Sequence, residues 1–192
     1  MIRKQNDARN LPFPGIFAIV LAGIIIYSFA FCPHFLYAQS QRVSYEELRQ
    51  KYVPQASPED TYRLELEMMS QGMYCYDLPI FDMQWRGKGN QVIYSSAYKN
   101  MQKWSTGFES YIEGDYAVIY YPQNKSCGPV FLYRDSSGWV IDRTTVINNI
   151  HYAPDNSSWL AYEGSYPYLG ILQKIFNLKK GKVGSTQAYT II

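Results

Sequence analysis

Two residues beyond the N-terminal segment have side chains suited to nucleophilic catalysis, Cys127 and His151. A cysteine thiolate is a strong nucleophile, and a neighbouring imidazole can take its proton while Asp142 or Asn148 orients the ring. This combination would give a cysteine-dependent hydrolase. However, the segment after Cys127 is predicted as a strand, and not as the helix N-terminus that would lower the pKa of the thiol. The sequence therefore favours a structural thiol and a loop histidine over a catalytic pair.

The same cysteine has a second candidate role, in a disulfide. The chain has three cysteines, of which Cys32 lies in the N-terminal apolar segment. Cys75 and Cys127 remain as an even pair, which is typical of a domain that meets an oxidising compartment. A bond closing this loop would contribute on the order of 4 kcal/mol in the chain-entropy model. The alternative is two free thiols buried as small hydrophobic residues, and the sequence leaves both open.

Other common catalytic arrangements are missing from the sequence. One histidine and two cysteines are too few for a zinc site, and there is no Gly-x-Ser-x-Gly nucleophile elbow. Glu65 and Glu67 fall on opposite sides of a helix, so they suggest no acid–base pair. We therefore predict no metal and no cofactor, and the balance favours a protein that is not an enzyme.

The charge balance bears on possible partners. The formal net charge is +2, and beyond residue 38 basic and acidic side chains are equal in number. A neutral domain is not expected to bind nucleic acid, because phosphate contacts need clustered Lys and Arg. The basic cluster of Lys179, Lys180 and Lys182 is interpreted as part of a solvated C-terminal tail, residues 179–192.

The first 38 residues have the layout of a secretory signal. Residues 16–32 form an apolar run with Ser28 as its only polar side chain, and basic residues precede it at positions 3, 4 and 9. The lack of a polar face argues against a buried helix of a soluble protein. We expect this segment to enter a membrane, with the following domain on the far side.

The sequence leaves open whether this leader is removed. Pro33 and the small side chain of Ala38 predict cleavage between Ala38 and Gln39, which would release the domain into the periplasm or the extracellular space. Alternatively, residues 16–32 stay in the membrane as an anchor. A helix of this length spans about 25 Å, close to the hydrocarbon thickness of about 30 Å.

Local signals predict helices first and strands afterwards. Ser44 and Glu47 form a capping box, and Ser57 caps a second helix. The face of that helix carrying Tyr62, Leu66, Met69 and Met73 is expected in the core. Helices are predicted over residues 44–52, 58–71, 94–104 and 167–176, and strands over residues 108–112, 116–121, 129–134, 139–145 and 159–162.

This order implies an α+β fold with N-terminal helices packed on a curved antiparallel sheet. Residues 39–56 form a short helix and linker, and residues 57–178 the globular domain. The strand pattern of residues 113–142, Gly-Asp-Tyr-Ala-Val followed by a hairpin ending Gly-Trp-Val-Ile, resembles the nuclear-transport-factor-like (cystatin-like cone) superfamily. The helix opened by Ser57-Pro58-Glu59 is similar to the first helix of that fold, so the resemblance covers roughly residues 57–145.

The resemblance implies a sheet wrapped round a conical apolar pocket, which binds small molecules or remains a packed core. None of the superfamily's catalytic residues matches a position in this chain. Aromatic residues make up 17% of the sequence, including 19 Tyr, and tyrosines suit a surface that binds. We therefore expect a binding module for a small apolar ligand or a protein partner. The alternatives are the hydrolase with Cys127 and His151, and a structural envelope protein.

Overall fold

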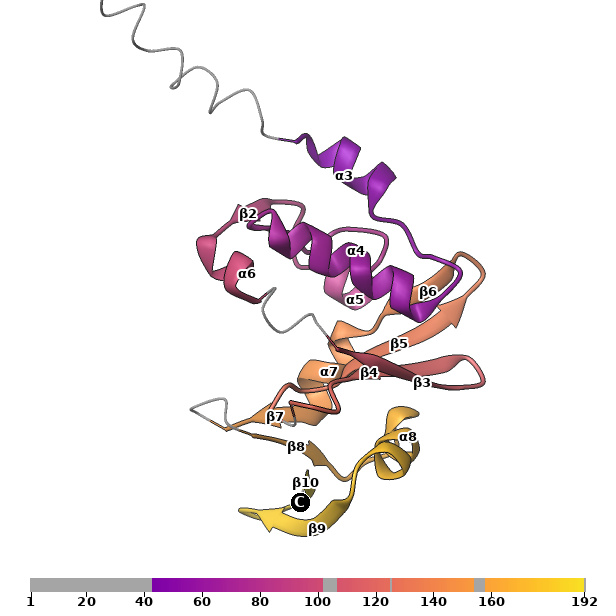
Figure 1. Cartoon of the computed structure of the whole chain (residues 1–192), viewed down its shortest axis with the longest axis vertical. Coiled ribbons are helices and arrows are strands. Elements are labelled where there is room, and N and C mark those ends of the chain that lie inside the picture. The colour runs from indigo at the N-terminus through magenta and orange to yellow at the C-terminus, as the bar shows by residue number, and fades with distance from the viewer. Residues whose placement is uncertain (1–42, 102–106, 125, 154–157, 192) are drawn as a thin grey trace, which may run out of the picture. The chain divides into compact units, whose positions relative to one another are not determined.

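A computed structural model of the chain describes residues 43–191, except 102–106, 125 and 154–157 (Figure 1). The predicted membrane segment 16–32 and the predicted cleavage site at Ala38 and Gln39 lie outside these residues. Within the described ranges, no helix has the length and apolar character needed to cross a membrane. Ser44–Ile192 forms one compact unit, which is wider than the predicted domain of residues 57–178.

The fold is α+β, as predicted, and the strands named below pair antiparallel. The helices are α3 (Tyr45–Lys51), α4 (Pro58–Ser70), α5 (Met83–Arg86), α6 (Ser96–Met101), α7 (Arg143–Asn149) and α8 (Tyr168–Ile175). The strands are β1 (Met73–Cys75), β2 (Val92–Tyr94), β3 (Glu109–Glu113), β4 (Tyr116–Tyr120), β5 (Val130–Asp135), β6 (Gly138–Ile141), β7 (Ile150–Tyr152), β8 (Trp159–Tyr162), β9 (Leu178–Val183) and β10 (Thr186–Ile191).

In the described part of the chain the strands divide among three sheets, where the sequence predicted one curved sheet. Their orders are β1-β2, β3-β4-β5-β6 and β7-β8-β10-β9. The first four-stranded sheet is buried on both faces, because alternate residues of β4 enter two different cores. Ala117 and Ile119 pack on the side of α4, while Val118 packs on the side of α8. Figure 1 shows the two helices on opposite sides of this sheet.

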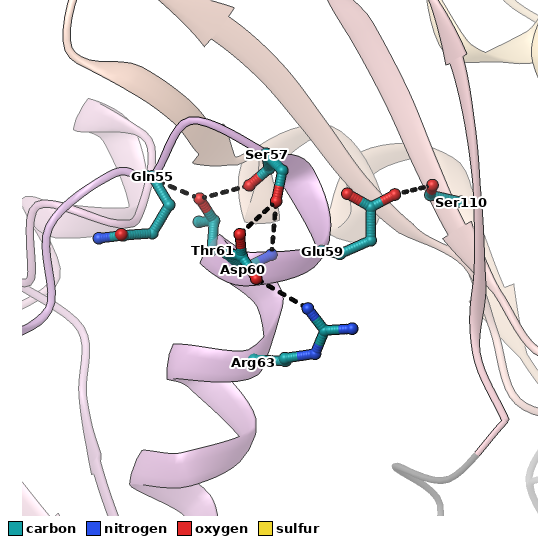
Figure 2. Close-up of polar contacts among 7 residues, drawn as sticks. All are labelled: Gln55, Ser57, Glu59, Asp60, Thr61, Arg63 and Ser110. Carbon is teal, nitrogen blue, oxygen red and sulfur yellow. Dashed lines mark hydrogen bonds and ion pairs between the residues drawn. The ribbon is translucent and has the colours of Figure 1, made fainter.

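Local capping explains where α4 begins. The Ser57 hydroxyl oxygen accepts a hydrogen bond from the backbone N–H of Asp60 at 3.1 Å, which satisfies one of the free donors of the first turn. Arg63 donates to the Asp60 carboxylate at 2.7 Å (Figure 2). The capping signal in the sequence is therefore confirmed, as is the capping box of Ser44 and Glu47 at α3.

Two further side chains fasten the same end of α4 to the sheet. The buried Thr61 hydroxyl donates to the Trp139 carbonyl of β6 at 3.0 Å, and the Ser110 hydroxyl of β3 donates to the Glu59 carboxylate. Figure 2 shows Glu59 reaching across to Ser110 while Thr61 sits under the first turn. Because the contacts reach both edge strands of the sheet, they fix the direction in which α4 crosses it.

The sequence predicted a solvated tail over residues 179–192. In the structure the described residues of this segment belong instead to the folded unit. Strands β9 and β10 form a hairpin, and β10 also pairs with β8. The three lysines of β9 are exposed, and Lys180 forms an ion pair with Glu163 at 2.6 Å. On the other side, the Tyr168 ring of α8 stacks on Phe131 of β5 with centroids 4.2 Å apart, which joins α8 to the central sheet.

Candidate functional site

A cavity of about 480 Å³ lies beside α4, within the size range of small-molecule sites. It is lined by residues of α4, by the segment 126–130 that leads into β5, and by Tyr121, Arg143 and Tyr152. Segments far apart in the chain thus meet here, because Tyr121 follows β4, Arg143 begins α7 and Tyr152 ends β7.

Most of the cavity wall is apolar. Leu66 and Met69 come from α4, while Pro129 and Val130 come from the start of β5. The spacing of Tyr62, Leu66 and Met69 predicts that this stripe of α4 lies in the core. In the structure these three side chains pack with the core and also face the cavity. A wall of this kind favours an apolar body in whatever molecule occupies it.

A buried ion pair supplies the charged groups of the wall. The Glu65 carboxylate is fully buried, and the Arg143 side chain is 21% exposed. The Arg143 guanidinium donates from Nε at 3.1 Å and from Nη2, both to Oε1 of Glu65. Burial by itself would lower the pKa of Arg143, but the Glu65 carboxylate, together with the neighbouring Tyr74 and Tyr62 hydroxyls, raises it above its usual value. Arg143 is therefore held in its charged form.

The two carboxylate oxygens of Glu65 differ in their hydrogen bonds. Oε1 accepts the Arg143 bonds and also a hydrogen bond from the Tyr74 hydroxyl at 3.1 Å. Oε2 is buried and has no hydrogen-bond partner among the described residues. Buried carboxylate oxygens without a donor are costly and rare in folded proteins. Glu65 is thus a residue of the cavity wall with a buried hydrogen-bond acceptor that no described donor satisfies.

Tyrosine hydroxyls give the wall further polar points. The hydroxyls of Tyr62 and Tyr121 hydrogen-bond to each other. Burial raises the pKa of Tyr62 well above its usual value, and it raises the pKa of Tyr121 to about 12. Burial also raises the pKa of Tyr152. All three are therefore neutral at physiological pH and can offer hydrogen bonds without adding charge.

The thiol and imidazole singled out in the sequence are not brought together as a catalytic pair. Cys127 lines the cavity, and burial raises the pKa of its thiol, which keeps it in the less reactive protonated form. His151 is exposed, and its ring lies 6.0 Å from that of Tyr162. Its neighbour Tyr152 lines the cavity, and successive side chains of a strand point to opposite faces. No hydrogen bond joins Cys127 to His151, both of which are described.

The residues proposed to orient the imidazole have other roles. Asp142 caps α7 by accepting from the backbone N–H of Thr145 at 2.9 Å, and it accepts a hydrogen bond from the Tyr168 hydroxyl at 3.1 Å. Asn148 is exposed on α7. Neither has a hydrogen bond to His151 in the described part of the chain.

The second cysteine role considered from the sequence, a disulfide, is not formed in the structure. Cys75 and Cys127 are both free thiols. Cys75 is fully buried in the core beneath α4, whereas Cys127 is partly buried in the cavity wall. Within the described ranges, no group of three or more His, Cys, Asp or Glu side chains is placed to hold a metal ion.

Comparisons of the chain with protein-family models, with curated proteins and with solved structures found no match. The resemblance of residues 57–145 to the nuclear-transport-factor-like superfamily therefore stays a prediction.

Proposed function

We propose that this domain binds a small, largely apolar molecule in the cavity beside α4. The observation that carries the proposal is the cavity itself, about 480 Å³ in volume, with apolar walls and a few convergent polar groups. That combination is the usual form of a small-molecule site. The raised pKa of the Cys127 thiol and the lack of a hydrogen bond between Cys127 and His151, both described, favour binding over hydrolysis.

The location of the domain belongs to the same proposal. The basic and apolar leader in residues 1–38 supports export across a membrane or anchoring in it. A binding domain held there would meet its ligand outside the cytoplasm. N-terminal sequencing of the protein from its host distinguishes the two forms: a chain starting at Gln39 is released, and an intact leader recovered with membranes is an anchor. An intact leader on a soluble chain would contradict both.

A cavity-filling substitution tests the binding proposal. Leu64 and Leu66 are both partly buried on α4 and pack against the same core, but only Leu66 is among the residues lining the cavity. We expect small aromatic probes such as ethylbenzene and benzyl alcohol to bind the wild-type chain. The Leu66→Trp variant should lose this binding, because the indole occupies the space, and Leu64→Trp should keep it.

The change in the side-chain NMR signals of the protein during titration with each probe measures binding. Signals of Tyr62 and Tyr121 should move most, because both rings line the cavity. The proposal is wrong if neither probe binds the wild-type chain, or if folded Leu66→Trp binds both probes as tightly as Leu64→Trp does.

A further inference from the structure

We infer that the molecule held in this cavity presents an uncharged hydrogen-bond donor, a hydroxyl or an amide N–H, to Oε2 of Glu65. This inference rests on the proposed function and specifies the chemical class of the ligand. It starts from Glu65, a residue of the cavity wall whose carboxylate is fully buried and accepts hydrogen bonds from the described residues at only one of its two oxygens.

The need for a donor follows from the hydrogen bonds already made. Tyr74 and Arg143 both donate to Oε1, and none of the described residues donates to Oε2. A buried acceptor without a donor carries its full desolvation cost. A ligand that donates to Oε2 removes this cost, and an apolar ligand of the same shape does not.

The charge balance of the wall argues that the donor is neutral. Among the residues that line the cavity, Glu65 and Arg143 carry charge, and they form an ion pair with each other. An ammonium group entering the cavity would be a second cation beside one carboxylate, with no further counter-ion, and burying it would be costly. A carboxylate ligand would face Oε2, which repels it. A hydroxyl or an amide has neither penalty.

Water is the competing partner for this oxygen, since a single buried water molecule can satisfy such a group. If a water molecule already satisfies Oε2, ligands that differ only in a hydroxyl or a methyl group should bind with equal affinity, apart from the effect of their different solubilities. The experiment therefore compares probes of equal shape and removes the solubility difference by comparing two forms of the protein.

The probes are ethylbenzene, benzyl alcohol and benzylammonium, which differ in the last atom of the side chain. The second form of the protein is the Glu65→Met, Arg143→Met double variant. Replacing both partners of a buried ion pair with apolar residues of similar volume often leaves a protein folded. The measured quantity is the ratio of the dissociation constants of ethylbenzene and benzyl alcohol, obtained by NMR titration of the 192-residue chain.

We expect this ratio to be at least about tenfold larger in the wild-type chain than in the double variant, as for a hydrogen bond to a charged acceptor. Benzylammonium should bind the wild-type chain more weakly than benzyl alcohol. Equal ratios in both proteins overturn the inference while leaving the proposed function intact, and tighter binding of benzylammonium overturns the claim of a neutral donor. Failure of both ethylbenzene and benzyl alcohol to bind the wild-type chain overturns the proposed function as well.

A measurement on the wild-type chain keeps the inference testable if the double variant does not fold. The carboxyl carbons of glutamate are labelled with carbon-13, and the Glu65 signal is followed during titration. Benzyl alcohol should move this signal in proportion to the fraction bound, because a new donor reaches Oε2, and ethylbenzene should move it far less. Equal movement with both probes overturns the inference.

Discussion

Gly128 and Tyr152 are in direct contact in the wall of the cavity. A Cβ atom added at Gly128 would lie 2.6 Å from Cζ of the Tyr152 ring and closer still to its hydroxyl oxygen. Real side chains do not approach so closely, so the ring occupies space that exists only because residue 128 has no side chain. Although Tyr152 is 39% exposed as a whole, the hydroxyl end of its ring is packed against this backbone.

Gly128→Ala should therefore displace the Tyr152 ring and reshape the cavity. We expect a loss of unfolding free energy on the order of 1–3 kcal/mol, as for other overpacked sites, and weaker binding of benzyl alcohol. Denaturant unfolding and NMR titration measure the two effects. Gly181→Ala is the matched control, because its Cβ would meet nothing within 4 Å. In a Tyr152→Ala background the cost of Gly128→Ala should fall to a few tenths of a kcal/mol. An unchanged cost there would contradict the packing argument.

The parts of the fold that the sequence predicted correctly are those set by local chemistry. Ser57 and Pro58 start α4 in the structure as they do in the sequence. The turn chemistry of Asp135 to Gly138 gives the β5–β6 hairpin, with Gly138 at a φ of 127°. These signals act between near neighbours, so they can be read without knowing the rest of the fold.

The parts that were predicted wrongly depend on distant contacts. The fourth strand was expected to run to residue 145, because Thr144 and Thr145 are β-branched. Instead α7 begins at Arg143, since Asp142 caps it and the Thr144 hydroxyl donates to Asp82 at 2.6 Å. Asp82 lies 62 positions away in the chain, and nothing in the sequence near Thr144 predicts this contact.

The candidate site was missed for the same reason. Glu65 and Arg143 are separated by 78 positions, and each resembles an ordinary surface residue in its own segment. The one available signal was Glu65 itself, a carboxylate on the same helix face as the apolar stripe of Tyr62 and Met69, where a charge needs a partner. The sequence could raise that question, but only the folded structure answers it, by placing Arg143 at the start of α7 against Glu65 of α4.

The ion pair of Glu65 and Arg143 gives a second prediction, on stability. Arg143→Met should lower the unfolding free energy by about 3–5 kcal/mol, because it leaves a buried carboxylate without its counter-ion. Adding Glu65→Met should restore most of the loss, although Tyr74 then lacks its acceptor. Urea unfolding monitored by circular dichroism measures both.

The exposed pair of Lys174 and Glu113 provides the control for this comparison. Its side chains are 50% and 51% exposed, so Lys174→Met should cost at most about 1 kcal/mol. If Arg143→Met costs no more than Lys174→Met, the Glu65 carboxylate is not buried as the structure has it.

The buried tyrosines predict a loss of stability at alkaline pH. Burial raises the pKa of Tyr121 and of Tyr166 from 10.0 to about 12, and it also raises that of Tyr62 well above 10.0. Below pH 10 these groups are protonated in both states, so they have no effect on the pH dependence. Between about pH 10 and 12 the unfolded chain loses their protons and the folded chain keeps them, so the unfolding free energy falls as pH rises.

Urea unfolding at a series of pH values, with tyrosinate absorbance recorded in parallel, measures this effect. The double variant Tyr62→Phe, Tyr121→Phe removes two of the buried hydroxyls together and should flatten the alkaline loss. Tyr111→Phe, at a more exposed tyrosine of β3, should leave it unchanged. A double variant with the same alkaline loss as the wild-type chain would show that these hydroxyls are hydrated in the folded state.

The two thiols give a prediction about both the disulfide and the cavity. Burial raises the pKa of Cys75 and of Cys127, and the thiolate is the form that reacts. With iodoacetamide at neutral pH and no reductant, Cys127 should react more slowly than a thiol in a short peptide, and fully buried Cys75 more slowly again. Benzyl alcohol should slow the alkylation of Cys127 further, because Cys127 lines the cavity in which we expect the probe to bind. It should leave the alkylation rate of Cys75 unaffected. Peptide mass spectrometry follows the alkylation of each residue separately.

The same reaction in denaturant, still without reductant, tests for the disulfide. Both thiols should then be alkylated completely. If both resist alkylation until a reductant is added, the protein carries the disulfide that the structure does not form.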